Sequence, residues 1–383
     1  MTRPDRDSIV SLLSQLVGID SVNPSLVPGG AGEEEVARFV ASWLESAGIA
    51  SIVDEVAPGR FNAVGRLPGT GGGKSLMLNA HTDTVGLGAM AAPLDLRLEG
   101  DKAYGRGAYD MKGSLAAVML AAKELAAGSP LAGDMVIAAV ADEEYASLGT
   151  QALLKTDVTD GAIVTEPTSL NICVAHKGFA WIQIETEGRA AHGSRPDLGV
   201  DAIGMMGEVL TELNKLSLRL SERPAHSLLG HASLHASLIQ GGQELSSYPA
   251  RCLLQVERRT LPGESAEDVT VEIARVLGAV ERREPTFRAA ASTFYWRDAF
   301  EAGARSRLVE EMQESARTLL GVEPDVVGET PWMDSAFTQT AGVSTVVFGP
   351  GGSGAHSDEE WVSVRDIAAC AEVLVDVARR YCQ

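Results

Sequence analysis

The chain has 383 residues, of which 45% are hydrophobic and 5% aromatic, and 32 basic against 52 acidic residues give a net charge of −20. Such an acidic chain is poorly suited to nucleic acid or an anionic membrane, because binding there relies on Lys and Arg neutralising phosphates. No apolar stretch reaches membrane-spanning length and no signal-peptide pattern opens the chain, so we expect a cytoplasmic protein. The length favours two domains.

Apolar periodicity predicts alternating helices and strands in the first and last parts of the chain. A helix is expected over residues 36–44, with Gly48 placed to end it. Further helices are expected at 112–127, 149–155, 303–320 and 364–381, and strands at 60–66, 75–80, 135–141, 162–165 and 344–348. This alternation predicts an α/β fold in which a mixed sheet carries helices on both faces.

The middle of the chain follows a different order. Between 177 and 285 we expect two helices, at 199–216 and 265–278, and three strands, at 180–187, 232–240 and 251–260. This order predicts a two-layer α+β domain with its own core, inserted into the first domain. The sequence therefore indicates a discontinuous α/β/α domain of residues 1–176 and 286–383, with residues 177–285 as the insert.

Polar residues suited to a metal site lie beside the predicted elements of the α/β domain. In open α/β sheets, ligands bind at the carboxyl ends of strands, so residues just past strands are expected to meet. Imidazole and carboxylate suit zinc, and a carboxylate beside a metal-activated water can act as a general base. Each residue alone could be a surface acid or a capped turn, but together they predict a metal site: His81, Asp83, Asp110, Glu143, Glu144, Glu166 and His356.

Five motifs in this order resemble the M20 family of dinuclear zinc amidohydrolases. They are His81-x-Asp83, Gly105 to Gly113, Asp142-Glu143-Glu144, Glu166-Pro-Thr, and Gly349-Pro-Gly with His356. The family includes acetylornithine deacetylase, succinyl-diaminopimelate desuccinylase, aminoacylases and glutamate-releasing carboxypeptidases. The segments Arg259 to Gly263 and His356 to Trp361 look closest to the acetylornithine deacetylase branch.

The resemblance implies a zinc-dependent hydrolase that cuts the amide of an N-acyl amino acid. A dipeptidase or a glutamate-carboxypeptidase-like exopeptidase is the alternative within the family. A non-catalytic metal-binding scaffold is the alternative of a different class, although a protein released from catalysis would not need the candidate base.

The same resemblance implies roles for the candidate ligands. Asp110 would bridge two zinc ions, His81 and Glu166 would complete one site, and Glu144 and His356 would complete the other. Cobalt or manganese would also suit this ligand set.

Two neighbouring acids receive the remaining roles at the metal site. Glu143 would be the general base, and Asp83 would hydrogen-bond the far nitrogen of His81 and fix its tautomer. Asp83 could instead be a plain N-cap, and Glu143 and Glu144 could exchange roles.

In the family, the inserted domain acts as a lid and dimerisation domain. His192 would reach the partner subunit's site and bind the oxyanion, which implies a homodimer; it could also be a plain turn histidine. Arg259 would hold the substrate carboxylate, with Arg258 as the rival because strand alternation lets only one of the two face the site. Ser246 stands where the family carries a substrate-binding asparagine, which leaves the substrate open, and Gly351 is a further expected substrate contact.

Overall fold

The computed structural model describes residues 4–303 and 306–383, and the chain divides into two compact units. The first unit comprises Met1–Val174, Ala302–Val327 and Met333–Gln383. The second comprises Ala175–Glu301 and Gly328–Trp332. Within the described residues, no helix has the length and apolar character needed to cross a membrane.

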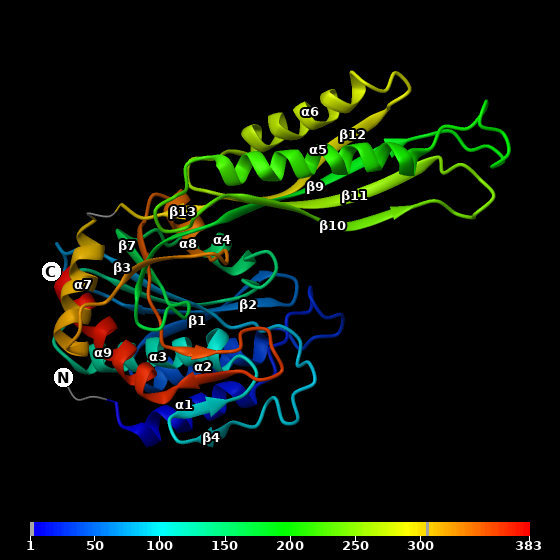
Figure 1. Cartoon of the computed structure of the whole chain (residues 1–383). Coiled ribbons are helices and arrows are strands. Elements are labelled where there is room, and N and C mark those ends of the chain that lie inside the picture. Colours follow the sequence, from blue (N-terminus) through cyan, green and yellow to red (C-terminus); the bar gives the residue numbers. More distant parts are fainter. Residues whose placement is uncertain (1–3, 304–305) are drawn as a thin grey trace. The chain divides into compact units, whose positions relative to one another are not determined.

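A mixed sheet forms the centre of the first unit (Figure 1). In spatial order, its strands are β1 (Ala50–Ala57), β2 (Arg60–Leu67), β6 (Met135–Val140), β3 (Leu76–His81), β7 (Gly161–Val164), β15 (Ser344–Val347), β8 (Ile172–His176) and β13 (Phe300–Glu301), and β14 (Val326–Glu329) also pairs with β8. Strands β6, β3, β7 and β15 run parallel, whereas β1, β2 and β8 pair antiparallel with their neighbours. The predicted mixed α/β sheet is confirmed.

Helices cover both faces of this sheet. They are α1 (Arg6–Gly18), α2 (Glu34–Ser46), α3 (Gly113–Ala127), α4 (Leu148–Leu153), α7 (Arg307–Leu320), α8 (Ser335–Thr340) and α9 (Val364–Tyr381), with the short kinked turn η1 (Ala108–Lys112), in which Asp110 and Met111 are not helical, before α3. A small sheet joins β16 (Gly352–Ser353), β17 (Trp361–Ser363), β5 (Lys102–Tyr104) and β4 (Arg97–Glu99). The helix expected from residue 303 begins at Arg307, and residues 304–305 lie outside the described chain.

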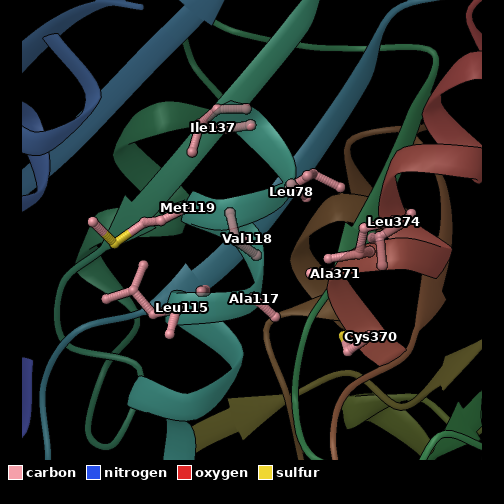
Figure 2. Close-up of a cluster of buried hydrophobic side chains, with 14 of the residues drawn as sticks. Leu78, Leu115, Ala117, Val118, Met119, Ile137, Cys370, Ala371 and Leu374 are labelled. Carbon is pink, nitrogen blue, oxygen red and sulfur yellow. The ribbon is translucent and has the colours of Figure 1, made fainter. Parts of the chain in front are cut away.

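The main core lies between the parallel strands and helices α3 and α9. Figure 2 shows Leu78 of β3 and Ile137 of β6 beside Val118 of α3 and Leu374 of α9, and all four are fully buried. Burying a side chain of this size stabilises the fold by ~1.5–3 kcal/mol. Because parallel strands are covered on both faces, they are near-continuous apolar runs, which explains why the sequence pattern located them well.

The second unit is a four-stranded antiparallel sheet with two helices. The strand order is β10 (Ser233–Gly241), β11 (Arg251–Thr260), β9 (Gly178–Glu187) and β12 (Ala289–Arg297). Helices α5 (Ala202–Glu222) and α6 (Ala266–Glu281) pack on one face of this sheet, as Figure 1 shows. Burial alternates along β9 and β11 because only that face is covered.

The predicted boundary of the inserted domain at residue 285 is wrong. Strand β12 pairs with β9, with Tyr295 opposite Trp181, so residues 289–297 belong to the second unit, which extends to Glu301 although β13 pairs with β8 at the edge of the main sheet. The error has a physical reason. A bulge between Thr293 and Tyr295 breaks the alternation of β12, and only its pairing across the sheet shows which core it joins.

Candidate metal centre

Five of the predicted ligands meet in the first unit. Asp110 lies between two imidazoles: its Oδ1 is 3.0 Å from His81 Nε2, and its Oδ2 is 3.3 Å from His356 Nε2. His81 Nε2 is also 3.6 Å from Glu166 Oε1, and His356 Nε2 is 2.9 Å from Glu144 Oε2. Two donor groups result, each with ligand atoms within 4.8 Å of one another, and they share Asp110.

Strand topology accounts for this convergence. His81 is the last residue of β3, Glu144 follows β6, and Glu166 follows β7. These three strands are adjacent and parallel, so their carboxyl ends reach the same edge of the sheet. His356 lies just past β16, in the segment that follows the next parallel strand, β15, and Asp110 lies in η1.

A buried carboxylate that the sequence analysis did not single out holds the turn that carries Asp110. Glu360 Oε1 accepts the backbone N–H groups of Tyr109 and Asp110 at 2.9 and 3.0 Å. Its Oε2 accepts the N–H of Gly107 at 3.0 Å and Nη1 of Arg106 at 2.8 Å. No local pattern distinguishes Glu360 from the two exposed acids before it. Its contacts with the turn that carries Asp110 can therefore be recognised only in the folded structure.

Asp83 contacts His81 differently from the prediction. His81 Nδ1 lies 2.9 Å from the backbone carbonyl of Asp83, whereas the Asp83 carboxylate is 3.7 Å away. That carboxylate instead accepts the backbone N–H groups of Glu143 and Glu144 at 3.1 and 3.2 Å. The Asp83 carboxylate therefore lies at ion-pair distance from His81 Nδ1, while the hydrogen bond to that nitrogen involves the backbone carbonyl of the same residue.

Glu143 lies next to these ligands but belongs to neither donor group of the described chain. Burial and the charge of Glu166 raise the pKa of Glu143 well above its usual value. Burial and the charge of Asp110 raise the pKa of Glu144 to about 7. Burial raises the pKa of Glu166 to about 8, against the lowering effect of His81. The negative charge of the carboxylates at this site is therefore larger than the positive charge that the two imidazoles can provide.

The imidazoles show the opposite electrostatic effect. Hydrogen bonds with Asp110 and Glu144 raise the pKa of His356 to about 10. Burial alone would lower the pKa of His81, but the charge of Glu166 and the hydrogen bond with Asp110 raise it well above its usual value. Burial would raise the pKa of Asp110, yet hydrogen bonds with His356 and His81 hold it well below its usual range. This site favours positive charge, and its imidazole and carboxylate donors fit two divalent cations that share Asp110.

Asp334 is a further buried acid that the sequence analysis missed. Its Oδ2 accepts a hydrogen bond from Thr150 Oγ1 at 2.5 Å, and its Oδ1 has no hydrogen-bond partner among the described residues. Burial raises the pKa of Asp334 to about 6. Its charge also contributes to the raised pKa values of Glu143 and Glu166, so it lies close enough to influence the site.

Comparisons with known proteins agree with this geometry. The model of peptidase family M20/M25/M40 matches residues 77–380. The protein belongs to this family. The chain is 29% identical over 390 residues to the acetylornithine deacetylase of Proteus mirabilis, with 98% of this chain and 97% of the relative covered. Family membership makes the M20 protein a hydrolase.

Solved structures share its fold. Aminopeptidase PepT of Bacillus cereus aligns with a TM-score of 0.81 at 18% identity, covering 100% of both chains. YxeP of Bacillus subtilis, described as a dinuclear metal binding peptidase from the M20 family, aligns with a TM-score of 0.77 at 14% identity, covering 98% of both chains. At such low identity these likenesses establish the fold alone.

The second unit of the M20 protein separates the two rival arginines. Arg258 is 1% exposed and forms ion pairs with Glu264 and Glu272. Arg259 points to the other face of the sheet, where its side chain is 32% exposed and its guanidinium lies 5.1 Å from the centre of the Phe179 ring. Of the two arginines, Arg259 is the more accessible, and its Nε donates to Glu257 Oε1 at 2.6 Å.

His192 and Ser246 lie together in two exposed loops of the second unit. Gly193 donates its N–H to the carbonyl of Ser246 at 2.6 Å, and His192 forms a β-bridge with Ser247. His192 Nδ1 is 2.8 Å from Ser194 Oγ, so its Nε2 is the ring nitrogen left for a ligand.

Gly351 is buried in the first unit, and both of its backbone polar groups are engaged. Its N–H donates to Asp366 Oδ2 at 3.2 Å, and its carbonyl accepts the N–H of Ser363 at 2.9 Å. A side chain at this position would meet Asp366 Oδ2 at 2.5 Å, which accounts for a glycine here. A role for Gly351 in substrate binding stays a prediction.

Proposed function

We propose that the protein hydrolyses the amide bond of an N-acyl amino acid with two bound zinc ions. The observation that carries this proposal is the pair of donor groups sharing Asp110, with the unliganded carboxylate of Glu143 beside them. The acetylornithine deacetylase that matches almost the whole chain supports the substrate class. The cytoplasmic location expected from the sequence is part of this proposal.

The five ligands divide between the ions as the donor groups suggest. His81 and Glu166 would hold one ion, Glu144 and His356 the other, and Asp110 would bridge them. When bound, such ions lower the pKa of water and polarise a carbonyl, and cobalt or manganese would do the same in this donor set.

Glu143 moves the proton in this proposal. Its carboxylate takes a proton from the attacking water and later delivers it to the leaving nitrogen. The Asp83 carboxylate, which accepts the N–H groups of Glu143 and Glu144, holds the backbone of both residues. The base and the neighbouring ligand are thereby fixed relative to each other.

Two residues of the second unit would bind the substrate. The Arg259 guanidinium would pair with the free carboxylate of the amino acid, because its planar fork matches a carboxylate. His192 would donate from Nε2 to the oxyanion that forms at the amide carbon, a contact typically worth ~3–4 kcal/mol.

Within one chain these two residues lie too far apart to share a small substrate. Arg259 is near the end of β11, whereas Ser247, which is bridged to His192, lies before the start of β11 at Arg251. Eight residues of strand span ~26 Å at ~3.3 Å per residue. We therefore infer that His192 comes from a second copy of the chain.

The edge of the second sheet supports a homodimer. Strand β10 is an edge strand, and its side chains Leu238 and Ile239 are 65% and 57% exposed. Exposed apolar edge strands readily pair with another chain. A closed two-fold dimer, the commonest soluble assembly, would cover this edge and exchange His192 between subunits.

A peptidase acting on short peptides is the second candidate. Ser246, in the position where asparagine was expected, favours it. A serine hydroxyl cannot reproduce both hydrogen bonds of an amide side chain, so the substrate group at this position differs.

A substrate panel distinguishes the two candidates. The zinc-loaded protein is assayed with N-acetyl, N-succinyl and N-formyl amino acids and with dipeptides, and kcat/KM is measured for each. We expect an N-acyl amino acid to be the best substrate. Preference for dipeptides would establish the peptidase, and metal binding without turnover of any substrate would favour a non-catalytic scaffold.

A further inference from the structure

A buried polar network lies behind the turn that carries Glu143. Its centre is Arg60, the first residue of β2, whose side chain is 6% exposed. Arg60 donates from Nε to Glu33 Oε2 at 2.8 Å and from Nη1 to Ser25 Oγ at 2.9 Å. Its Nη2 contacts Glu33 Oε1 and lies 2.8 Å from Asp142 Oδ1. The planar guanidinium can donate hydrogen bonds to all these partners at the same time, whereas the ammonium group of a lysine cannot.

Asn23 connects this network to Asp83. Its side-chain nitrogen donates to Asp83 Oδ2 at 2.7 Å and to Asp142 Oδ1 at 3.0 Å. Asn23, Asp83 and Asp142 are each at most 1% exposed. Because the Asp83 carboxylate accepts the N–H groups of Glu143 and Glu144, an unbroken series of contacts runs from the guanidinium to the backbone of the turn.

The backbone of Asp142 needs such support. Its φ is +71°, in the left-handed region that residues other than glycine rarely adopt. Its carbonyl accepts the N–H of Ala146 at 3.0 Å, which closes the turn. A strained residue persists only where its surroundings hold it, and here Arg60 and Asn23 hold the side chain.

We propose that Arg60 is a positioning residue for the reaction, which fixes the Asp142–Ser147 turn and thereby the carboxylate of Glu143. The inference rests on the proposed role of Glu143 as the base. Without the guanidinium, the carboxylates of Glu33 and Asp142 would remain buried without their cation, and the turn would rearrange to reach water. Displacing a catalytic group by ~1 Å costs ~10²-fold in rate.

Two substitutions test this role. Arg60→Lys keeps the charge but loses the fork, and Arg60→Gln loses both. We expect each variant to bind two metals per chain and to lower kcat by ~10–100-fold with KM little changed, as for other residues that support a site from behind. Amide hydrogen exchange, read by mass spectrometry, should be faster in residues 142–150.

Arg66 provides the matched control. It lies on the same strand and pairs with both oxygens of Asp157, at 2.8 and 2.9 Å, away from the turn. Arg66→Lys and Arg66→Gln should leave kcat and the exchange of residues 142–150 unchanged. A fall in kcat shared by both arginines would mean a general loss of stability and would overturn the specific role of Arg60.

A double-mutant cycle tests the link through Asp142. If Arg60 acts through this ion pair, Arg60→Gln and Asp142→Asn together lose less activity than the product of their separate losses. Wild-type kcat in Arg60→Lys, or independent losses in the cycle, would overturn the proposal. Glu143→Gln is assayed alongside. If this variant kept its activity, the proposed role of Glu143 as the base would be rejected. Hydrogen exchange tests the effect of Arg60 on the turn independently, because it does not depend on catalysis.

Discussion

The candidate metal centre and the proposed substrate-binding residues of the second unit differ in how the fold holds them. The ligand Glu166 and the turn residue Asp83 are buried, and the latter accepts two backbone N–H groups. His192 and Ser246, in contrast, lie in exposed loops. Four of the five candidate ligands have side chains at most 17% exposed, with His356 at 55%, whereas the proposed substrate-binding residues His192 and Ser246 belong to exposed loops.

The largest expected effect on metal content and activity comes from removing Asp110, the candidate ligand that both donor groups share. Asp110→Ala should lose both metals and essentially all activity, because Asp110 contributes an oxygen to each donor group. Metal content per chain is measured by elemental analysis. Asp101→Ala is the control, because Asp101 hydrogen-bonds Ser363 away from the donor groups and should leave two metals bound. Full metal occupancy in Asp110→Ala would contradict the bridging role.

The next largest effect separates the base from the ligand beside it. Glu143→Gln should keep two metals and lower kcat by ~10²–10⁴-fold, since it removes proton transfer and leaves the donor atoms in place. Glu144→Gln should instead lose metal, because Glu144 faces His356. The opposite pattern in metal content would show that the two glutamates exchange roles.

The third prediction tests whether His192, which lies in an exposed loop, contributes to the active site of the partner subunit. His192→Ala should lower kcat by ~10²–10³-fold through loss of an oxyanion donor. Co-expressed with Glu143→Gln, it should form heterodimers in which one site has both groups, so activity returns. His231→Ala, an exposed histidine of the same unit, is the control and should keep activity. Proven heterodimers without activity would place His192 in its own chain's site.

The smallest expected effect on activity concerns recognition of the substrate carboxylate. Arg259→Ala should slow the free-acid substrate by ~10–100-fold, the value of a charged hydrogen bond, and should leave the amidated substrate unaffected. Arg251 lies on the same face of β11 at its other end, paired with Glu185, and Arg251→Ala should preserve the preference for the acid. Equal kcat/KM for acid and amide in the unmodified protein would reject the carboxylate clamp.

The sequence alone determined the main elements and pointed to the five residues that the fold brings together as candidate metal ligands. The buried strands β3, β6 and β7 are apolar runs, and a polar residue directly after such a run is a strong local signal. Their parallel order then brings His81, Glu144 and Glu166 together, so proximity followed from topology. Strand alternation also predicted that only one of Arg258 and Arg259 could face the site, and the two side chains do lie on opposite faces of β11, with Arg258 buried.

Only the tertiary structure decided contacts that join distant segments. Strand β12 belongs to the second unit because it pairs with β9, and no local sequence pattern predicted this pairing. Arg60 pairs with Asp142 across more than eighty residues of sequence and with Glu33 across 27, and Glu360 holds the turn before Asp110 from the far end of the chain. Such residues carry no local signature, because a buried charge is stabilised by whichever partner the fold places opposite it. Their roles therefore follow from the packing of the whole unit.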